Sequence, residues 1–205
     1  EMPAEKFIDE VLLSISGLKL IYLGHDFKIG KGKKDSLFTL KQKAKEREIE
    51  VISEEPLLVS GEVVGSSSIR QMLTDGLIPE VSSKLGRNFC FHGVVERGRG
   101  IGSKKLVATA NILVAPEKII PKSGVYATKL YVGGKPFLSL TNIGVNPSVT
   151  SENKQCIEVH VLDFSEMIYD EQVSVEFLYR VRDEKKFQNI SKLKEQILQD
   201  ISFVK

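Results

Sequence analysis

The chain has 205 residues, and its 29 Lys and Arg against 27 Asp and Glu give a formal net charge of +2. A hydrophobic fraction of 41% with 27% charged residues is typical of a folded globular protein and excludes a disordered or fibrous chain. The charge is too small to indicate a nucleic-acid partner, and the apolar runs are too short to cross a bilayer.

Two cysteines, Cys90 and Cys156, do not make a disulfide scaffold, so reduced thiols in a cytoplasmic protein are expected. No signal peptide is visible. The first residue is Glu1 rather than Met, and we expect the sequence to start inside a longer protein.

Residues 1–86 alternate between helical and strand patterns, which predicts an α/β layer with a parallel sheet. Residues 4–13 place Ile8, Val11 and Leu12 on one helical face. Residues 18–23 read as a buried parallel strand. A charged helix is expected over residues 37–48 and a helix start at residues 66–73.

The pattern changes at residues 85–87, where strands separated by Gly, Pro and Asn replace the α/β alternation. Strands are expected at residues 89–94, 125–132, 137–143, 156–164 and 172–179, with a hairpin turn at Gly133-Gly134. An antiparallel barrel buries such strands without long free edges. Ile190, Leu193, Ile197 and Ile201 recur at helical spacing, so a terminal amphipathic helix is expected to pack on the barrel.

The glycine-rich segment at residues 97–105 is the densest candidate for a phosphate site. Alternate glycines let backbone N–H groups approach a phosphate, and Lys and Arg supply counter-charge. A solvated hairpin tip explains the same composition. The residues are Gly98, Gly100, Gly102 and Lys104.

Two strand segments carry further candidate groups. Thr109 and Asn111 share one side of an extended segment, where they either hold a metal-bound phosphate oxygen or cap a turn. Glu158 alternates with Ile157 and Val159 and so points to the opposite face. A carboxylate there can accept a proton from a hydroxyl nucleophile, although an ordinary solvent-facing residue fits the pattern too.

Two segments of the first 86 residues are also candidates. The loop with Gly24, Asp26 and Phe27 follows a strand, where open α/β sheets bind ligands. Ser66, Ser67 and Arg70 lie at a helix start, where they form a phosphate site or simple caps.

The order of these segments resembles the prokaryotic bifunctional riboflavin kinase/FMN adenylyltransferases (FAD synthetases). The shared series is Gly-x-Asp-Phe-x-x-Gly, a Ser run with Arg, Leu-Gly-Arg, a Gly-rich stretch ending Thr-Ala-Asn, Glu-Val-His-x-Leu-Asp-Phe and Arg-Asp-Glu-Lys-Lys-Phe. The resemblance implies an incomplete Rossmann-like adenylyltransferase domain at residues 1–86 and a complete riboflavin kinase domain at residues 87–205, a six-stranded antiparallel barrel with a C-terminal helix.

Carried over by residue, the resemblance implies that Thr109 and Asn111 hold Mg²⁺ and the ATP phosphates. Glu158 is implied as the base on the riboflavin 5′-hydroxyl, and Arg182 as a residue on the flavin side. The substrates are then riboflavin and ATP, without nucleic acid or membrane, and the oligomeric state is left open. Gly24, Asp26, Phe27, Ser66, Ser67 and Arg70 are remnants of an adenylyltransferase site.

The sequence departs from the family at two places. The nucleotide-binding motif of adenylyl transfer does not occur, so FAD synthesis is expected only if a longer protein supplies it. Leu106 and Ala108 replace the Gly and Pro that precede the family's Thr-Ala-Asn. An active kinase is favoured because Thr109, Asn111 and Glu158 are retained, and the alternative is a flavin- or nucleotide-binding regulatory protein whose kinase has decayed.

Overall fold

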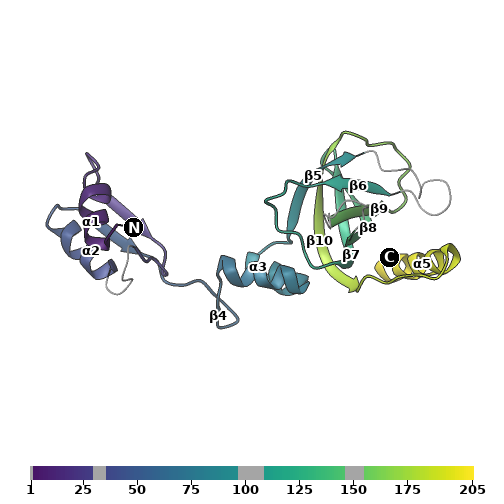
Figure 1. The fold of residues 1–205 in the computed structure, drawn as a ribbon, viewed down its shortest axis with the longest axis horizontal. Coiled ribbons are helices and arrows are strands. Elements are labelled where there is room, and N and C mark those ends of the chain that lie inside the picture. Colours follow the sequence, from purple (N-terminus) through teal and green to yellow (C-terminus); the bar gives the residue numbers. More distant parts are fainter. Residues whose placement is uncertain (1, 30–35, 97–108, 146–154) are drawn as a thin grey trace. The chain divides into compact units, whose positions relative to one another are not determined.

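The computed structural model describes residues 2–29, 36–96, 109–145 and 155–205 (Figure 1). Chain contacts divide it into two compact units, residues 1–64 and 65–205. The first unit contains α1 (Ala4–Phe7), the π-helix η1 (Ile8–Leu12), β1 (Leu20–Leu23), α2 (Ser36–Lys45), β2 (Glu50–Ser53), β3 (Leu58–Val59) and β4 (Glu62–Val63). The second contains α3 (Ser66–Asp75), α4 (Ile78–Leu85), β5 (Cys90–Glu96), β6 (Ala110–Leu113), β7 (Gly124–Val132), β8 (Lys135–Val145), β9 (Gln155–Val161), β10 (Gln172–Arg182) and α5 (Ile190–Val204).

The first unit is built on a parallel pair of strands, β1 and β2, as the α/β alternation predicts. Ile21 and Leu23 of β1 face a small core with Leu40 of α2, whereas Tyr22 on the other face is 60% exposed. The prediction that this strand is buried on both faces is therefore wrong for the described residues, since helices cover one face of it.

The helix at the start of the chain winds differently from the expected α-helix. From Ile8 to Leu12 it is a π-helix, whose hydrogen bonds join residues five apart. Spacings of three and four residues then no longer define one face. Ile8 is buried as expected, but Val11 is 41% exposed and Leu13 takes the inward position, so the predicted place of Val11 is wrong.

Helices α3 and α4 pack with the barrel. Leu73, Ile78 and Val81 belong to the barrel's hydrophobic core, and the backbone N–H of Lys122 donates to the carbonyl of Leu73 at 3.0 Å. The helix α4 ends at Gly86, whose φ of 67° is the left-handed conformation that glycine adopts at helix ends. The change of sequence pattern at residues 85–87 thus marks the end of α4. The boundary between the two compact units lies earlier, between residues 64 and 65.

The strands β5 to β10 form a closed six-stranded barrel in the order β10-β5-β6-β9-β8-β7, with every pair antiparallel. This confirms the architecture that the family resemblance implies. Gly133 and Gly134 both have positive φ, at 55° and 79°, as a two-residue hairpin turn between β7 and β8 requires. The strand β6, of four residues, is the one that the strand patterns did not single out.

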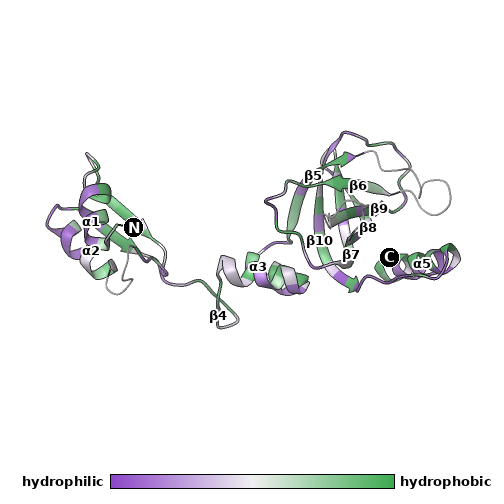
Figure 2. Cartoon of the chain, in the orientation of Figure 1, coloured by the Kyte–Doolittle hydropathy of each residue, from purple (hydrophilic) through white to green (hydrophobic). Residues whose placement is uncertain are grey.

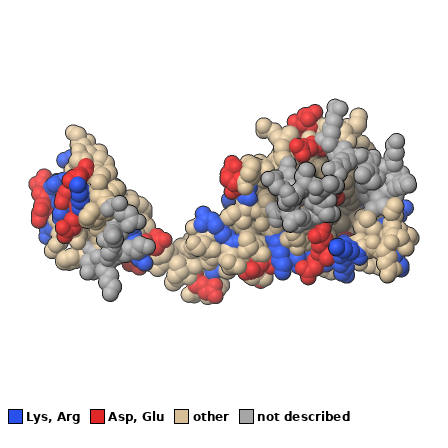
Figure 3. All heavy atoms as spheres, viewed as in Figure 1, with Lys and Arg blue, Asp and Glu red and all other residues tan. Residues whose placement is uncertain are grey.

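Alternation along the strands separates the barrel's interior from its outer surface. Inward side chains such as Val95, Ile157, Val159, Val175 and Phe177 are buried and form the core. Acidic and basic side chains are interspersed on the face shown in Figure 3. No helix in the described part of the chain has the length and apolar character needed to cross a membrane.

The C-terminal helix α5 forms as expected, and Leu193, Ile197 and Ile201 are half-buried, but Ile190 is 53% exposed, so its predicted place on the packed face is wrong. The helix begins at Asn189, whose side chain accepts a hydrogen bond from the backbone N–H of Lys192 at 2.9 Å, a common helix cap. Hydrophobic and hydrophilic residues occur together along it in Figure 2. Asp200 is buried and binds Arg182 at the end of β10, so an ion pair joins the helix to the barrel.

Candidate functional site

Four polar residues lie side by side across four neighbouring strands of the barrel. Asn111 of β6 pairs directly with Glu158 of β9, Glu158 pairs with Asn142 of β8, and Asn111 pairs on its other side with Glu96 of β5. Directly paired residues of antiparallel strands point to the same face, with Cβ atoms roughly 5 Å apart. We call Glu96, Asn111, Glu158 and Asn142 the polar row.

The polar row lies on the outer face of the barrel. Ile157 and Val159, which flank Glu158, are buried in the core, so the side chain of Glu158 points outward and is half-buried. Asn111 likewise precedes the buried Ile112. Strand pairing alone therefore brings together two of the three residues on which the sequence-based site depends, Asn111 and Glu158.

Cys156 adds a thiol to this surface. It lies two residues before Glu158 on β9, and its Sγ is 3.7 Å from Oε1 of Glu158 and 3.7 Å from Oδ1 of Asn111. Burial raises the pKa of the Cys156 thiol to about 11, and the negative charge of Glu158 adds to the effect. The thiol is therefore protonated at neutral pH and acts as a hydrogen-bond donor.

Thr109 and the end of β5 lie at the two ends of the glycine-rich segment in the chain. The chain leaves β5 at Glu96, a member of the row, and Thr109 is the exposed residue directly before β6. The segment between them joins the two strands that carry Glu96 and Asn111. Gly98, Gly100, Gly102 and Lys104, like the departures Leu106 and Ala108, lie outside the described residues.

Arg182 lies at the end of β10 and is held by α5. Its guanidinium donates to both carboxylate oxygens of Asp200 at 2.8–3.1 Å, and its Nη1 donates to the carbonyl of Asp183 at 3.0 Å. The guanidinium also lies 5.9 Å from the ring centre of Phe187, close enough for a cation–π contact. A residue predicted to be on the flavin side is thus fixed by protein groups on several sides.

The remaining predicted residues fall into separate units. Gly24, Asp26 and Phe27 form a turn after β1, at the carboxyl end of a parallel strand, and Phe27 packs on the core of the first unit. Ser66, Ser67 and Arg70 belong to α3 in the second unit, where Arg70 donates to the Ser66 hydroxyl at 3.2 Å. The turn after β1 lies where it was expected, but the N-cap of α3 is Gly65 and no side chain caps this helix, so the expected capping by Ser66 and Ser67 is wrong.

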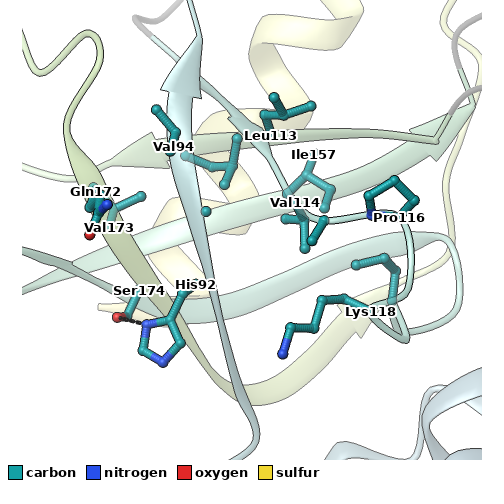
Figure 4. A pocket seen from close by; sticks show the side chains of 14 residues that line it. His92, Val94, Leu113, Val114, Pro116, Lys118, Ile157, Gln172, Val173 and Ser174 are labelled. Atoms are coloured by element: carbon teal, nitrogen blue, oxygen red, sulfur yellow. Dashed lines mark hydrogen bonds between the residues drawn. The ribbon is translucent and has the colours of Figure 1, made fainter.

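A separate cavity of about 910 Å³ opens beside β5 and the segment that follows β6 (Figure 4). Its described lining is mainly apolar, as with Val94, Leu113 and Ile157, and Lys118 lies at its margin. His92 there shares a hydrogen bond of 2.6 Å with Ser174. The described lining includes no carboxylate and none of the predicted site residues, so the polar row is the better candidate for proton-transfer chemistry.

The polar row offers oxygen atoms that suit a hard cation. An amide oxygen, a nearby hydroxyl and carboxylates are ligands that Mg²⁺ accepts. Among the described residues there is no group of three or more His, Cys, Asp or Glu side chains arranged to hold a metal ion. The donor set therefore fits a Mg²⁺ ion that is bound mainly through phosphate oxygens and water, as this ion usually is beside nucleotides.

Three members of this surface were not among the predicted site residues. Cys156 could have been found from its spacing, since residues two apart on a strand share a face. Glu96 and Asn142 carry no such signal, because their nearness to Glu158 depends on which strands pair.

Comparison with known proteins gives matches over nearly the whole chain. The family model described as riboflavin kinase matches residues 85–205, and the model described as FAD synthetase matches residues 1–68. The chain is 37% identical to the bifunctional riboflavin kinase/FMN adenylyltransferase of Buchnera aphidicola subsp. Schizaphis graminum, over 100% of the chain and 66% of that protein. It is 30% identical to the protein so named in Escherichia coli K12, over 97% of the chain and 63% of the relative.

A solved structure also covers the full chain. The crystal structure of a macrolide-efflux protein from Streptococcus pneumoniae superposes with a TM-score of 0.83 at 26% sequence identity, over 100% of the chain and 65% of that protein. The chain thus spans just under two thirds of the length of these curated relatives.

Proposed function

Because the chain belongs to the riboflavin kinase family, we propose that its barrel transfers the terminal phosphoryl group of ATP to riboflavin and releases FMN and ADP. The observation that carries the proposal is the direct pairing of Asn111 with Glu158 on the outer face of the barrel. Phosphoryl transfer to an alcohol needs a base at the hydroxyl and polar groups near the phosphate, and this pair supplies both kinds of group.

Glu158 is the proposed base on the 5′-hydroxyl of riboflavin. Its half-buried carboxylate lies next to an amide and a thiol, and these groups fix its position without neutralising its charge. As the oxygen of the hydroxyl attacks the phosphorus atom, its proton moves to the carboxylate. The bond between the phosphorus and the bridging oxygen breaks, and ADP leaves with that electron pair.

Asn111 and Thr109 are the proposed ligands of Mg²⁺ and of the ATP phosphates. The ion, when bound, neutralises phosphate charge and lowers the barrier to transfer. The glycine-rich segment joins the strands beside these residues, which supports a role for Gly98, Gly100, Gly102 and Lys104 in phosphate binding.

Arg182 is proposed to border the flavin. Because Asp200 and the Asp183 carbonyl already bind its guanidinium, we expect it to act mainly by holding the end of β10 against α5. This keeps the chain after β10 in one position relative to the barrel.

FMN adenylyltransferase activity is proposed only for a longer protein that carries the nucleotide-binding motif. The match of residues 1–68 to the FAD synthetase model supports this assignment for the first unit. Gly24, Asp26, Phe27, Ser66, Ser67 and Arg70 would then contribute to that site. We expect both activities in the cytoplasm, where riboflavin and ATP meet.

The direct test is to incubate the chain with riboflavin and Mg-ATP and to separate the flavins by HPLC. We expect FMN without FAD. Glu158→Gln is expected to lower turnover at least about 100-fold, with little loss of ATP binding, as removal of a general base does. Glu176→Gln serves as the control, since this outer-face carboxylate on β10 is bound by Asn88 and Tyr131, away from the polar row.

Two outcomes contradict the proposal. Wild-type turnover in the Glu158→Gln variant would remove Glu158 as the base. Tight FMN binding by the wild-type chain without any product would replace the kinase with a flavin-binding regulatory protein.

A further inference from the structure

We propose that Cys156 is a positioning residue, whose thiol holds the Glu158 carboxylate beside Asn111 with one oxygen free for the substrate hydroxyl. The inference rests on the proposed kinase function and deepens it.

The strand geometry places the thiol within reach of both partners. Cys156 and Glu158 are two residues apart on β9, so both side chains point outward over the same part of the sheet. Asn111 pairs with Glu158 on the neighbouring strand. The sulfur is 3.7 Å from Oε1 of Glu158 and 3.7 Å from Oδ1 of Asn111, within the longer range of hydrogen bonds to sulfur.

The chemistry of the three groups fixes the direction of the hydrogen bond. An ionised carboxylate only accepts hydrogen bonds, and the amide oxygen of Asn111 is also an acceptor. The thiol therefore provides the proton, and the charged oxygen of Glu158 is the stronger of its two acceptors. The single thiol proton is therefore donated to Glu158, while the sulfur stays near Asn111 at 3.7 Å without a second hydrogen bond.

This contact selects one orientation of a flexible side chain. Glutamate has three side-chain torsions, and holding it in one rotamer costs entropy that the contact offsets. With Oε1 occupied by the thiol, Oε2 remains to accept the proton of the attacking hydroxyl. Loss of the thiol donor is therefore expected to lower the rate of phosphoryl transfer strongly and to weaken substrate binding only slightly.

The first experiment compares three variants by steady-state kinetics. Cys156→Val keeps the approximate volume of the side chain and removes the hydrogen-bond donor. We expect kcat to fall about tenfold, which corresponds to a loss of about 1.4 kcal/mol. The KM values for riboflavin and ATP are expected to change less than about twofold. Cys156→Ser keeps a donor and is expected to stay within about threefold of the wild type. Cys90→Ala, at the other cysteine, is the control and is expected to match the wild type.

The second experiment detects the hydrogen bond without turnover. The infrared S–H stretching band lies in a region free of other protein absorption, and in the Cys90→Ala background it reports Cys156 alone. We expect the band at the lower frequency of a hydrogen-bonded thiol. Replacing Glu158 by Ala is expected to move it to higher frequency, because the charged acceptor is gone.

The outcomes separate this inference from the proposed function. A wild-type chain that makes no FMN refutes the kinase assignment and the positioning role with it. An active wild type whose Cys156→Val variant has unchanged kcat, or a Val variant that is more active than the Ser variant, refutes the positioning role alone. An S–H band that does not respond to Glu158→Ala also refutes it.

Discussion

The ion pair between Arg182 and Asp200 permits a quantitative prediction about how the helix α5 is held. The Arg182 and Asp200 side chains are only 14% and 5% exposed, and the carboxylate accepts three hydrogen bonds from the guanidinium and one from Gln196. Asp200→Asn keeps the shape and removes the charge, which leaves a buried guanidinium without its counter-charge. Breaking a buried pair in this way costs about 3 kcal/mol of the free energy of unfolding.

Urea unfolding followed by circular dichroism measures this loss. The matched control is Asp163→Asn, since Asp163 is 80% exposed where it pairs with Lys205, and an exposed pair contributes less than about 0.5 kcal/mol. The double change Arg182→Met with Asp200→Leu is expected to recover most of the stability, because an apolar pair needs no counter-charge. If Asp200→Asn is no more destabilising than Asp163→Asn, the buried pair does not hold α5.

Two further predictions concern the site. Because its pKa is raised to about 11, Cys156 should react with iodoacetamide at pH 8 about a hundredfold more slowly than a peptide thiol of ordinary pKa, and the rate should rise until the pH passes 11. Peptide mass spectrometry measures the rate of alkylation. Near-equal rates for Cys156 and the peptide thiol would contradict the raised pKa. Restoring Gly at position 106 and Pro at position 108 together should lower the Kd for Mg-ATP in calorimetry, and an unchanged Kd would mean that this segment does not contact phosphate.

The barrel could be predicted largely from period-two patterns and turn residues. The alternation in β5 and β9 follows directly from one face being buried, whereas the first five residues of β7 are all buried; Gly133-Gly134 marks the hairpin. The strand β6 was harder to find because its four residues, Ala110–Leu113, are too few for a periodic signal. It became part of the prediction only through the resemblance to the riboflavin kinase family, which the comparison confirms.

The helix η1 and the strand β1 show where local pattern fails. The exposure of Val11 follows from π-helical winding, which packing selects and residue spacing does not reveal. Tyr22 is exposed on a strand that reads as fully apolar, because an apolar run does not show how many faces its neighbours cover.

The candidate site depends on strand order, which no local pattern contains. Sequence motifs singled out Asn111 and Glu158. Because β6 follows β5 in the chain and β9 follows β8, these residues come together only if β6 and β9 are neighbouring strands of the barrel. A single-residue shift in that register would turn Asn111 into the core and leave Glu158 beside an apolar neighbour.

The proposed base and the proposed phosphate-binding segment belong to different parts of the chain, and this bears on the departures at positions 106 and 108. Glu158 lies on β9, opposite Asn111 on the paired strand β6, and its Oε1 is 3.7 Å from the Cys156 sulfur. The changed Gly and Pro lie in the segment that joins β5 to β6. Their loss should therefore weaken the affinity for ATP without moving the proposed base, Glu158. We accordingly expect a high KM for ATP together with a substantial kcat.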